Sequence, residues 1–232
     1  MDIFESFSKS VDYASKLLSR GAELIMMIIV SIIPIVNFIF MGYCAKILKE
    51  GPSRNEPPKF EKLGELFGEG VKIFVVGLLW AIPPIIVGVL ALVLTAPWLF
   101  IGGAANLALL WGGAFLLAMF LVLVVGIGVG IFGIVGILLA AKTGDIAKGF
   151  SFQHIMSVIN NVGFINHIIW VVVAAIITFV VGLLGMVPFI GWLITLVISP
   201  LLGTFLVRAA TLFYSDAMER ALLPLPPPPP AV

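Results

Sequence analysis

Two long uncharged stretches constrain what this chain can fold into. Residues 73–141 and residues 149–207, which are 69 and 59 residues long, contain no Asp, Glu, Lys or Arg. An α-helix needs about 20 apolar residues to cross the hydrocarbon core of a bilayer, so each stretch can hold at least two crossings. Because only 11% of the 232 residues are charged, polar side chains are too few to cover a soluble domain. The sequence therefore predicts an all-α, polytopic transmembrane helical bundle.

The remaining composition argues against other classes of protein. The formal net charge is +1, which provides no basic field to attract nucleic acid. The single cysteine, Cys44, can form no internal disulfide. Residues 1–23 carry charges of both signs and no small-residue cleavage site follows the first apolar run, so we expect no cleavable signal peptide.

The charged residues fall into four groups, here called charge islands 1 to 4. They comprise residues 2–23, 46–72, 142–148 and 208–220. Inserting Asp, Lys or Arg at the centre of a bilayer costs about 2.5–3.5 kcal/mol, so the islands are expected outside the membrane. The predicted membrane segments between them are residues 24–45, 73–95, 115–141, 168–187 and 191–212. Since basic loops favour the cytoplasm, we expect a multi-pass protein of the cell (plasma) membrane with cytoplasmic charged loops.

The first of these segments allows two interpretations because Pro34 lies near its centre. As a single kinked span, it would place the N-terminus outside the cell. Alternatively, residues 33–38 (IPIVNF) resemble residues 187–192 (VPFIGW), the predicted apex of a helical hairpin. Residues 14–33 and 35–49 would then form a shallow re-entrant hairpin, with every charge island on one side. We favour the hairpin, since proline is only tolerated inside a membrane helix. The candidate turn residues are Pro34, Asn37, Pro188, Gly191 and Trp192, and the total is five to six membrane segments.

Three segments have the apolar periodicity typical of helices that lie at a membrane surface. They are residues 3–18, 60–72 and 151–163. The apolar face of the first consists of Phe4, Phe7, Val11, Ala14 and Leu18. These helices could instead pack on cytoplasmic loops, but we favour the interfacial interpretation because each runs directly into a predicted span. Residues 96–113, which contain proline, glycine and tryptophan, are expected to form an interfacial connection on the far side.

Glycines give one predicted span a smooth helix face. Residues 128–133 match the G-x-G-x-x-G dinucleotide fingerprint, but that motif needs a preceding strand and a following acidic residue, neither of which fits here. Small residues let membrane helices approach closely. We expect internal packing against a neighbouring span in preference to a subunit interface. The helix-packing residues are Gly126, Gly130, Gly133 and Gly136.

The sequence presents no arrangement typical of catalysis or of metal binding. Coupled transporters normally keep an ionisable residue at membrane depth, whereas Arg208 is expected close enough to its helix end to reach the interface. His154 and His167 are 13 residues apart without a nearby cysteine or carboxylate, and are better explained as hydrogen-bonded interfacial residues than as metal ligands. We therefore expect a non-enzymatic protein without a cofactor or a metal.

Two features suggest contacts with other molecules. Basic residues in island 2 are candidates for binding lipid headgroups, although acids are interleaved with them: Lys46, Lys49, Arg54, Lys59 and Lys62. The C-terminal prolines favour a polyproline II rod that docks into aromatic grooves, or a stiff disordered tail: Pro224, Pro226, Pro227, Pro228, Pro229 and Pro230. The expected partners are membrane lipids and other membrane protein subunits, with no nucleic acid.

Several short motifs point to a known family. They are IPIVNF followed by Gly42 and Tyr43, GELFGEGVKIF at residues 64–74, KTGD and GFSF within residues 142–152, and the pair Asn160–Asn161. Across most of residues 1–215, the chain resembles the prokaryotic membrane proteins of domain-of-unknown-function family 4013. The resemblance implies a compact multi-helix membrane domain and no particular activity. The glycine-rich run and the proline tail depart from the family's pattern.

Together these features suggest one transmembrane domain, residues 1–223, followed by the polyproline tail, residues 224–232. We expect an accessory or scaffolding subunit of a larger membrane complex. One alternative is a carrier or lipid-handling protein for neutral or amphipathic molecules, working through hairpins broken at Pro34 and Pro188. Another is a membrane-shaping protein built from shallow hairpins.

Overall fold

The computed structural model describes residues 2–100 and 105–223, with side chains for residues 2–94 and 112–223. These residues form helices and, within the described ranges, no strand, which confirms the predicted all-α fold. The α-helices are α1 (Ile3–Ser15), α2 (Gly21–Ile32), α3 (Phe38–Glu50), α4 (Leu63–Phe100), α5 (Ala105–Thr143), α6 (Phe152–Val162), α7 (Phe164–Leu184) and α8 (Gly191–Leu222). Short 3-10 helices cover Lys16–Ser19 and Ala147–Phe150.

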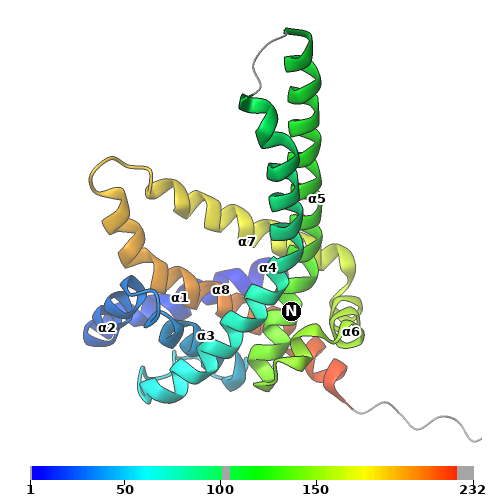
Figure 1. Cartoon of the computed structure of the whole chain (residues 1–232). Helices are drawn as coiled ribbons and strands as arrows, with labels where there is room; N and C mark the ends of the chain where they lie inside the picture. The colour runs from blue at the N-terminus through cyan, green and yellow to red at the C-terminus, as the bar shows by residue number, and fades with distance from the viewer. Residues whose placement is uncertain (1, 101–104, 224–232) are drawn as a thin grey trace, which may run out of the picture.

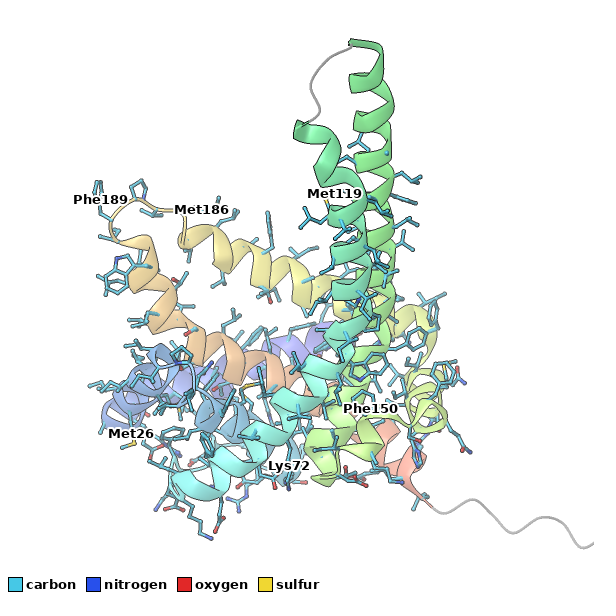
Figure 2. All side chains as sticks on the ribbon, viewed as in Figure 1. Met26, Lys72, Met119, Phe150, Met186 and Phe189 are labelled. Atoms are coloured by element: carbon cyan, nitrogen blue, oxygen red, sulfur yellow. The ribbon has the colours of Figure 1, made fainter. Side chains whose placement is uncertain are left out.

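The helices are arranged as a base and two hairpins (Figure 1). The base contains α1, α2, α3 and α6 together with the ends of α4, α5 and α8. From it, α4 and α5 rise side by side, while α7 and α8 form a second hairpin that diverges from the first. Figure 2 shows Phe189 and Met186 at the tip of the α7–α8 hairpin, far from Lys72 in the base.

Four helices in the described residues are long and apolar enough to cross a membrane. They are α7, α8 and the parts of α4 and α5 whose side chains are described, Leu63–Leu94 and Gly112–Thr143. Their apolar side chains point outward, with Leu94 and Leu116 each 68% exposed. Such a surface would be costly in water, so this is a membrane protein.

Residues 24–45 do not form one membrane-crossing helix, so the single-span interpretation is wrong. Helix α2 ends at Ile32, a turn follows, and α3 begins at Phe38. The turn is closed by a hydrogen bond from the Asn37 amide to the Ile33 carbonyl, 2.8 Å long. Pro34 lies in this turn because it has no N–H to continue α2. With 12 and 13 residues, α2 and α3 are each too short to cross a bilayer.

The predicted segments 73–95 and 115–141 are shorter than the helices that contain them. Helix α4 has 38 residues and includes both the expected interfacial segment from residue 63 and residues beyond 95. Helix α5 has 39 residues and begins at Ala105, so most of the expected connection, residues 96–113, is helical. In an apolar environment, continuing the helix is the simplest way to satisfy the backbone hydrogen bonds. Figure 1 shows that α4 bends along its length, which fits the Pro83–Pro84 pair near its middle.

The last hairpin also differs from its predicted bounds. Helix α7 begins at Phe164 and ends at Leu184, and α8 continues ten residues beyond the predicted end, to Leu222. Pro188 lies in the turn between them, and Gly191 is the first residue of α8. A Cβ on Gly191 would lie 2.7 Å from the Leu184 carbonyl oxygen, so the turn requires glycine there. Trp192 follows on α8 and is 62% exposed.

Helix α8 is the centre of the base, where α1, α2, α3 and α6 pack against it. Phe7 of α1 stacks on Trp170 of α7 with ring centroids 5.5 Å apart. The expectation that one face of α1 meets the membrane is wrong for Phe7 and Ala14, which are buried. Three other members of that face are exposed to 59–67%: Phe4, Val11 and Leu18. Helix α6 likewise buries Ile155 and Ile159 in the base and exposes Phe152.

Candidate functional site

The four charge islands, which are far apart in the sequence, meet in the base. Arg20 of island 1 donates a hydrogen bond to the Pro57 carbonyl of island 2, 2.8 Å away. Lys142 of island 3 reaches the Leu48 carbonyl in α3 at 3.4 Å, and Arg208 of island 4 donates to the Gly51 carbonyl at 3.1 Å. All four islands therefore lie on one side of the membrane helices.

The loop between α3 and α4, residues 51–62, is the element on which these contacts converge. Its three prolines, Pro52, Pro57 and Pro58, keep it extended, so its carbonyls have no helical partners. Side chains of neighbouring helices satisfy several of them instead. The Tyr43 hydroxyl donates to the Pro58 carbonyl at 3.1 Å, and the Lys46 ammonium donates to the Lys59 carbonyl at the same distance.

The five predicted headgroup-binding residues do not form one site. Lys49 pairs with Glu69 at 2.6 Å, and Lys62 pairs with Glu65 at 3.3 Å. Arg54 lies 3.9 Å from Glu50. One cavity is lined by Lys46, Lys49 and Lys72 together with Glu65 and Glu69. A second is lined by Arg20, Lys46, Arg54 and Lys59 together with Glu50, Glu56 and Glu61. Carboxylates therefore offset most of the basic charge in both places.

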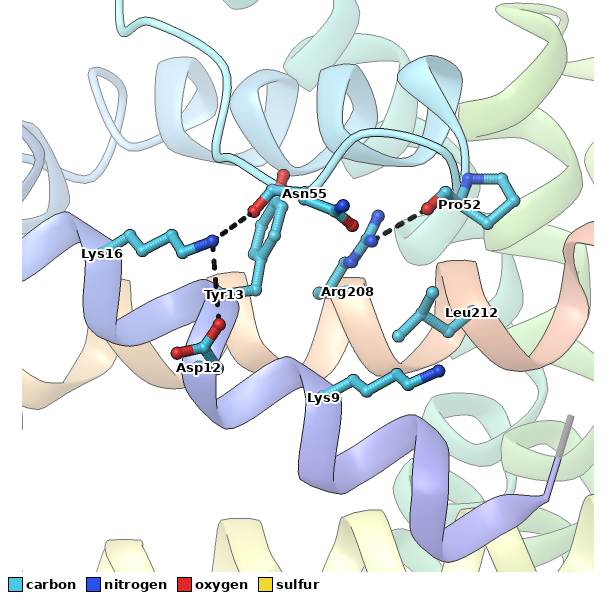
Figure 3. Close-up of a pocket in the computed structure, with 8 residues that line it drawn as sticks. All are labelled: Lys9, Asp12, Tyr13, Lys16, Pro52, Asn55, Arg208 and Leu212. Carbon is cyan, nitrogen blue, oxygen red and sulfur yellow. Dashed lines mark hydrogen bonds and ion pairs between the residues drawn. The ribbon is translucent and has the colours of Figure 1, made fainter.

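A third cavity has a different charge balance, and sequence reasoning missed it. It has a volume of about 480 Å³ and lies between α1, the 51–62 loop and α8 (Figure 3). We call it the basic cavity; its lining residues are Lys9, Asp12, Tyr13, Lys16, Pro52, Asn55, Arg208 and Leu212. Three of them are cations and one is a carboxylate. The sequence feature that could have indicated this cavity is the seven-residue spacing of Lys9 and Lys16, which places both on one face of a helix.

Arg208 contributes a buried positive charge to the basic cavity. Its side chain is nearly inaccessible, with 3% exposed, because α8 continues past it into the base. The expectation that Arg208 lies close to the end of its helix is therefore wrong, since α8 continues to Leu222. Its guanidinium donates to the carbonyls of Gly51 and Pro52 at 3.1 and 3.0 Å and lies 4.5 Å from the centre of the Tyr13 ring. In the described part of the chain, no carboxylate forms an ion pair with it, and its Nε is buried without a hydrogen-bond partner.

The other walls of the basic cavity are partly neutralised. Lys9 pairs with Glu5 at 2.8 Å, and this hydrogen bond and charge hold the pKa of Glu5 below its usual range. Lys16 lies 3.7 Å from Asp12 and donates to the Asn55 carbonyl at 2.9 Å. Burial raises the pKa of Tyr13 to about 12, so its phenol is neutral near pH 7. The buried charge of Arg208 is thus the one without an acidic partner.

The two histidines have structural partners. His167 Nε2 lies 3.0 Å from the Ile131 carbonyl, and His167 Nδ1 lies 2.8 Å from the Tyr214 hydroxyl. Since a carbonyl can only accept, Nε2 carries the proton and Nδ1 accepts from the hydroxyl. His167 thereby joins α5, α7 and α8. His154 lies 2.6 Å from the Ser151 hydroxyl, at the start of α6.

The four glycines of α5 divide into two pairs. A Cβ on Gly133 would lie 3.3 Å from the Trp80 ring of α4, and one on Gly136 would lie 2.7 Å from Trp80 Nε1. These two glycines serve the expected internal packing. A Cβ on Gly126 or Gly130 would meet nothing within 4 Å, so this pair faces outward. The candidate docking prolines, residues 224–230, lie outside the described residues.

One comparison with known proteins returned a match. The family model described as "Protein of unknown function (DUF4013)" matches residues 25–190. No curated protein and no solved structure matches the chain. The matched range runs from within α2 to the turn before α8. It therefore includes the 51–62 loop, while the three cations of the basic cavity lie outside it.

Proposed function

The chain belongs to this DUF4013 family, and from the arrangement of its helices we propose that it is a non-enzymatic accessory or scaffolding subunit of a larger membrane complex. The observation that supports this proposal is how much of the surface of the spanning helices the chain itself leaves uncovered. In an 18-residue apolar window of α5 none of the residues is buried, and in the corresponding windows of α4 and α7 the share is 11%. Their outward faces are available to helices of other chains.

The outward glycines indicate where a partner helix would approach most closely. Gly126 and Gly130 are four residues apart on α5, the spacing at which small residues let two membrane helices pack at short distance. The open space around both positions leaves room for a helix of another subunit. At Gly133 and Gly136, by contrast, the space beside α5 is already filled by Trp80.

Copurification tests this proposal. The tagged full chain is extracted from its own membrane in mild detergent, and co-migrating chains are quantified by mass spectrometry. We expect a stoichiometric partner that is lost in Gly130→Leu and retained in Gly88→Leu. Gly88 is the matched control because it also has open space around its Cβ position, but lies on α4. A monomer without a stoichiometric partner, or equal loss in both variants, contradicts the proposal.

A specific observation favours a carrier or lipid-handling protein as the second candidate. An apolar cavity of about 240 Å³ lies between α3, α4, α5 and α8, lined by Phe40, Met41, Cys44, Ala45, Leu48, Ile73, Ile137, Leu138, Ala141 and Val207. Burial raises the pKa of the Cys44 thiol to about 12, so this wall is uncharged near pH 7. The cavity suits a neutral or acyl-chain group. A monomer that copurifies with bound lipid would favour this function.

A further inference from the structure

We propose that the basic cavity binds a phosphate-bearing anion. This inference does not depend on the subunit role, because it rests on the charge and shape of one cavity and not on the outward helix faces. The ligand is a phosphate group, with Lys9 and Lys16 as direct contacts and Arg208 as the buried charge behind them. Neither the sequence-predicted headgroup residues nor the family match includes these three residues.

The charge of Arg208 is unbalanced within the described part of the protein. Burying a cation is costly unless an anion or several hydrogen bonds compensate it. Arg208 has two carbonyl acceptors and the face of the Tyr13 ring, all of which are neutral, and its Nε has no acceptor at all. The fold therefore holds a cation in place beside a cavity without supplying its counter-ion. An anion in the cavity would supply it.

Hydrogen-bond donors predominate around the cavity. Lys9 extends from α1 and Lys16 from the start of the 3-10 helix that follows it (Figure 3), and their ammonium groups only donate hydrogen bonds. The neutral Tyr13 phenol and the Asn55 amide add further groups able to donate. A phosphate has several acceptor oxygens and at least one negative charge, so it suits lining groups that mostly donate. The volume of about 480 Å³ lies within the range of small-molecule sites.

The position of the cavity relative to the bilayer also suits a phosphate. Helix α1 and the 3-10 helix that follows it supply the lysines and also expose Phe4, Val11 and Leu18 at a seven-residue spacing. This stripe occupies a different part of the helix surface from Lys9 and Lys16. An exposed apolar stripe beside a charged one is typical of a helix at the membrane interface. The cavity would then lie at the level of lipid phosphates, while its mouth also admits phosphate from water.

The experiment compares two matched pairs of charge-removing substitutions in the full-length chain. Lys9→Gln/Lys16→Gln removes two ammonium groups from the basic cavity. Lys59→Gln/Lys62→Gln removes two from island 2, at the positions of the sequence-based prediction. Each protein is reconstituted in nanodiscs of phosphatidylcholine with or without phosphatidylglycerol. Bound phosphatidylglycerol is counted by native mass spectrometry, and inorganic phosphate binding to the protein in neutral detergent is measured by calorimetry.

We expect Lys9→Gln/Lys16→Gln to weaken binding about tenfold or more, since each basic residue near an anionic surface contributes several-fold. Lys59→Gln/Lys62→Gln should retain wild-type binding, and both variants should melt at the wild-type temperature because these lysines are exposed. Loss confined to phosphatidylglycerol identifies a lipid headgroup as the ligand, and loss in both assays identifies free phosphate as sufficient. Absence of binding in both assays, or equal weakening by both variants, overturns the proposal.

Discussion

Polar side chains in the interior of this protein connect segments that are far apart in the sequence. His167 bridges the Ile131 carbonyl of α5 and the Tyr214 hydroxyl of α8, and Arg208 ties α8 to the loop after α3. Each is fully or almost fully buried. In an apolar region such hydrogen bonds matter for stability, because a donor or acceptor that loses its partner cannot form a hydrogen bond with water instead.

The hydrogen bond between His167 and Tyr214 should contribute measurably to stability. His167→Phe should lower the free energy of unfolding by about 1–3 kcal/mol, because the Tyr214 hydroxyl loses its buried acceptor. Tyr214→Phe should cost a similar amount, since it leaves His167 Nδ1 without a donor. The double variant should cost less than the sum of the two. Thermal unfolding in one detergent measures all three, and strict additivity would show that the two side chains do not interact.

At the scale of the helices, α3 and α4 are held together by a contact that only glycine permits. A Cβ on Gly42 would overlap the Leu66 carbonyl, and a Cβ on Gly70 would overlap the Phe38 carbonyl. The two helices therefore touch backbone to backbone. By contrast, Gly64 and Gly68 on the same stretch of α4 have nothing within 4 Å of their Cβ positions.

The different surroundings of Gly70 and Gly68 should give alanine substitutions at the two positions different effects on stability. Gly70→Ala should destabilise the protein by about 3 kcal/mol, because the new methyl group meets backbone atoms that cannot move aside. Gly68→Ala, two residues earlier, should be neutral or should stabilise α4 by up to about 1 kcal/mol through helix propensity. Thermal unfolding of the two variants provides the comparison. Equal stability of Gly70→Ala and Gly68→Ala would rule out the close contact.

For the whole molecule, the meeting of the charge islands determines the topology. Islands 1 and 2 are joined by Arg20 and Lys16, so the segment between them cannot cross the bilayer once. The N-terminus then lies on the same side as the 51–62 loop. Four crossings by α4, α5, α7 and α8 would place the turn between α7 and α8 on the other side.

Cysteine labelling tests this topology. In a Cys44→Ala background, cysteines are placed at Ser8, Asn55 and Phe189, which are all exposed. In sealed oriented vesicles, a membrane-impermeant maleimide should label Ser8→Cys and Asn55→Cys from the same side. Phe189→Cys should be labelled from the opposite side. Labelling of Ser8→Cys and Asn55→Cys from different sides would contradict the contacts between islands 1 and 2.

Much of the fold could be predicted because it depends on local properties of the chain. The uncharged runs identified the bilayer as the solvent, and Pro34 with its flanking residues suggested a turn where α2 ends. Helix ends were harder to predict. Residues 96–113 contain residues that break helices in water, yet in an apolar environment the need to pair every backbone group extends α4 and α5.

Hydropathy and charge along the chain predict the class of protein, the apolar runs that contain the spanning helices and the separation of charge into islands. These follow from hydropathy, which adds up along the chain. Tertiary contacts, by contrast, bring Lys9, Lys16 and Arg208 around one cavity and pair three lysines of island 2 with glutamates: Lys49, Lys62 and Lys72. The reason is physical: whether a charge is compensated depends on groups within a few ångströms in space, and Arg208 lies more than 150 residues from the loop it binds.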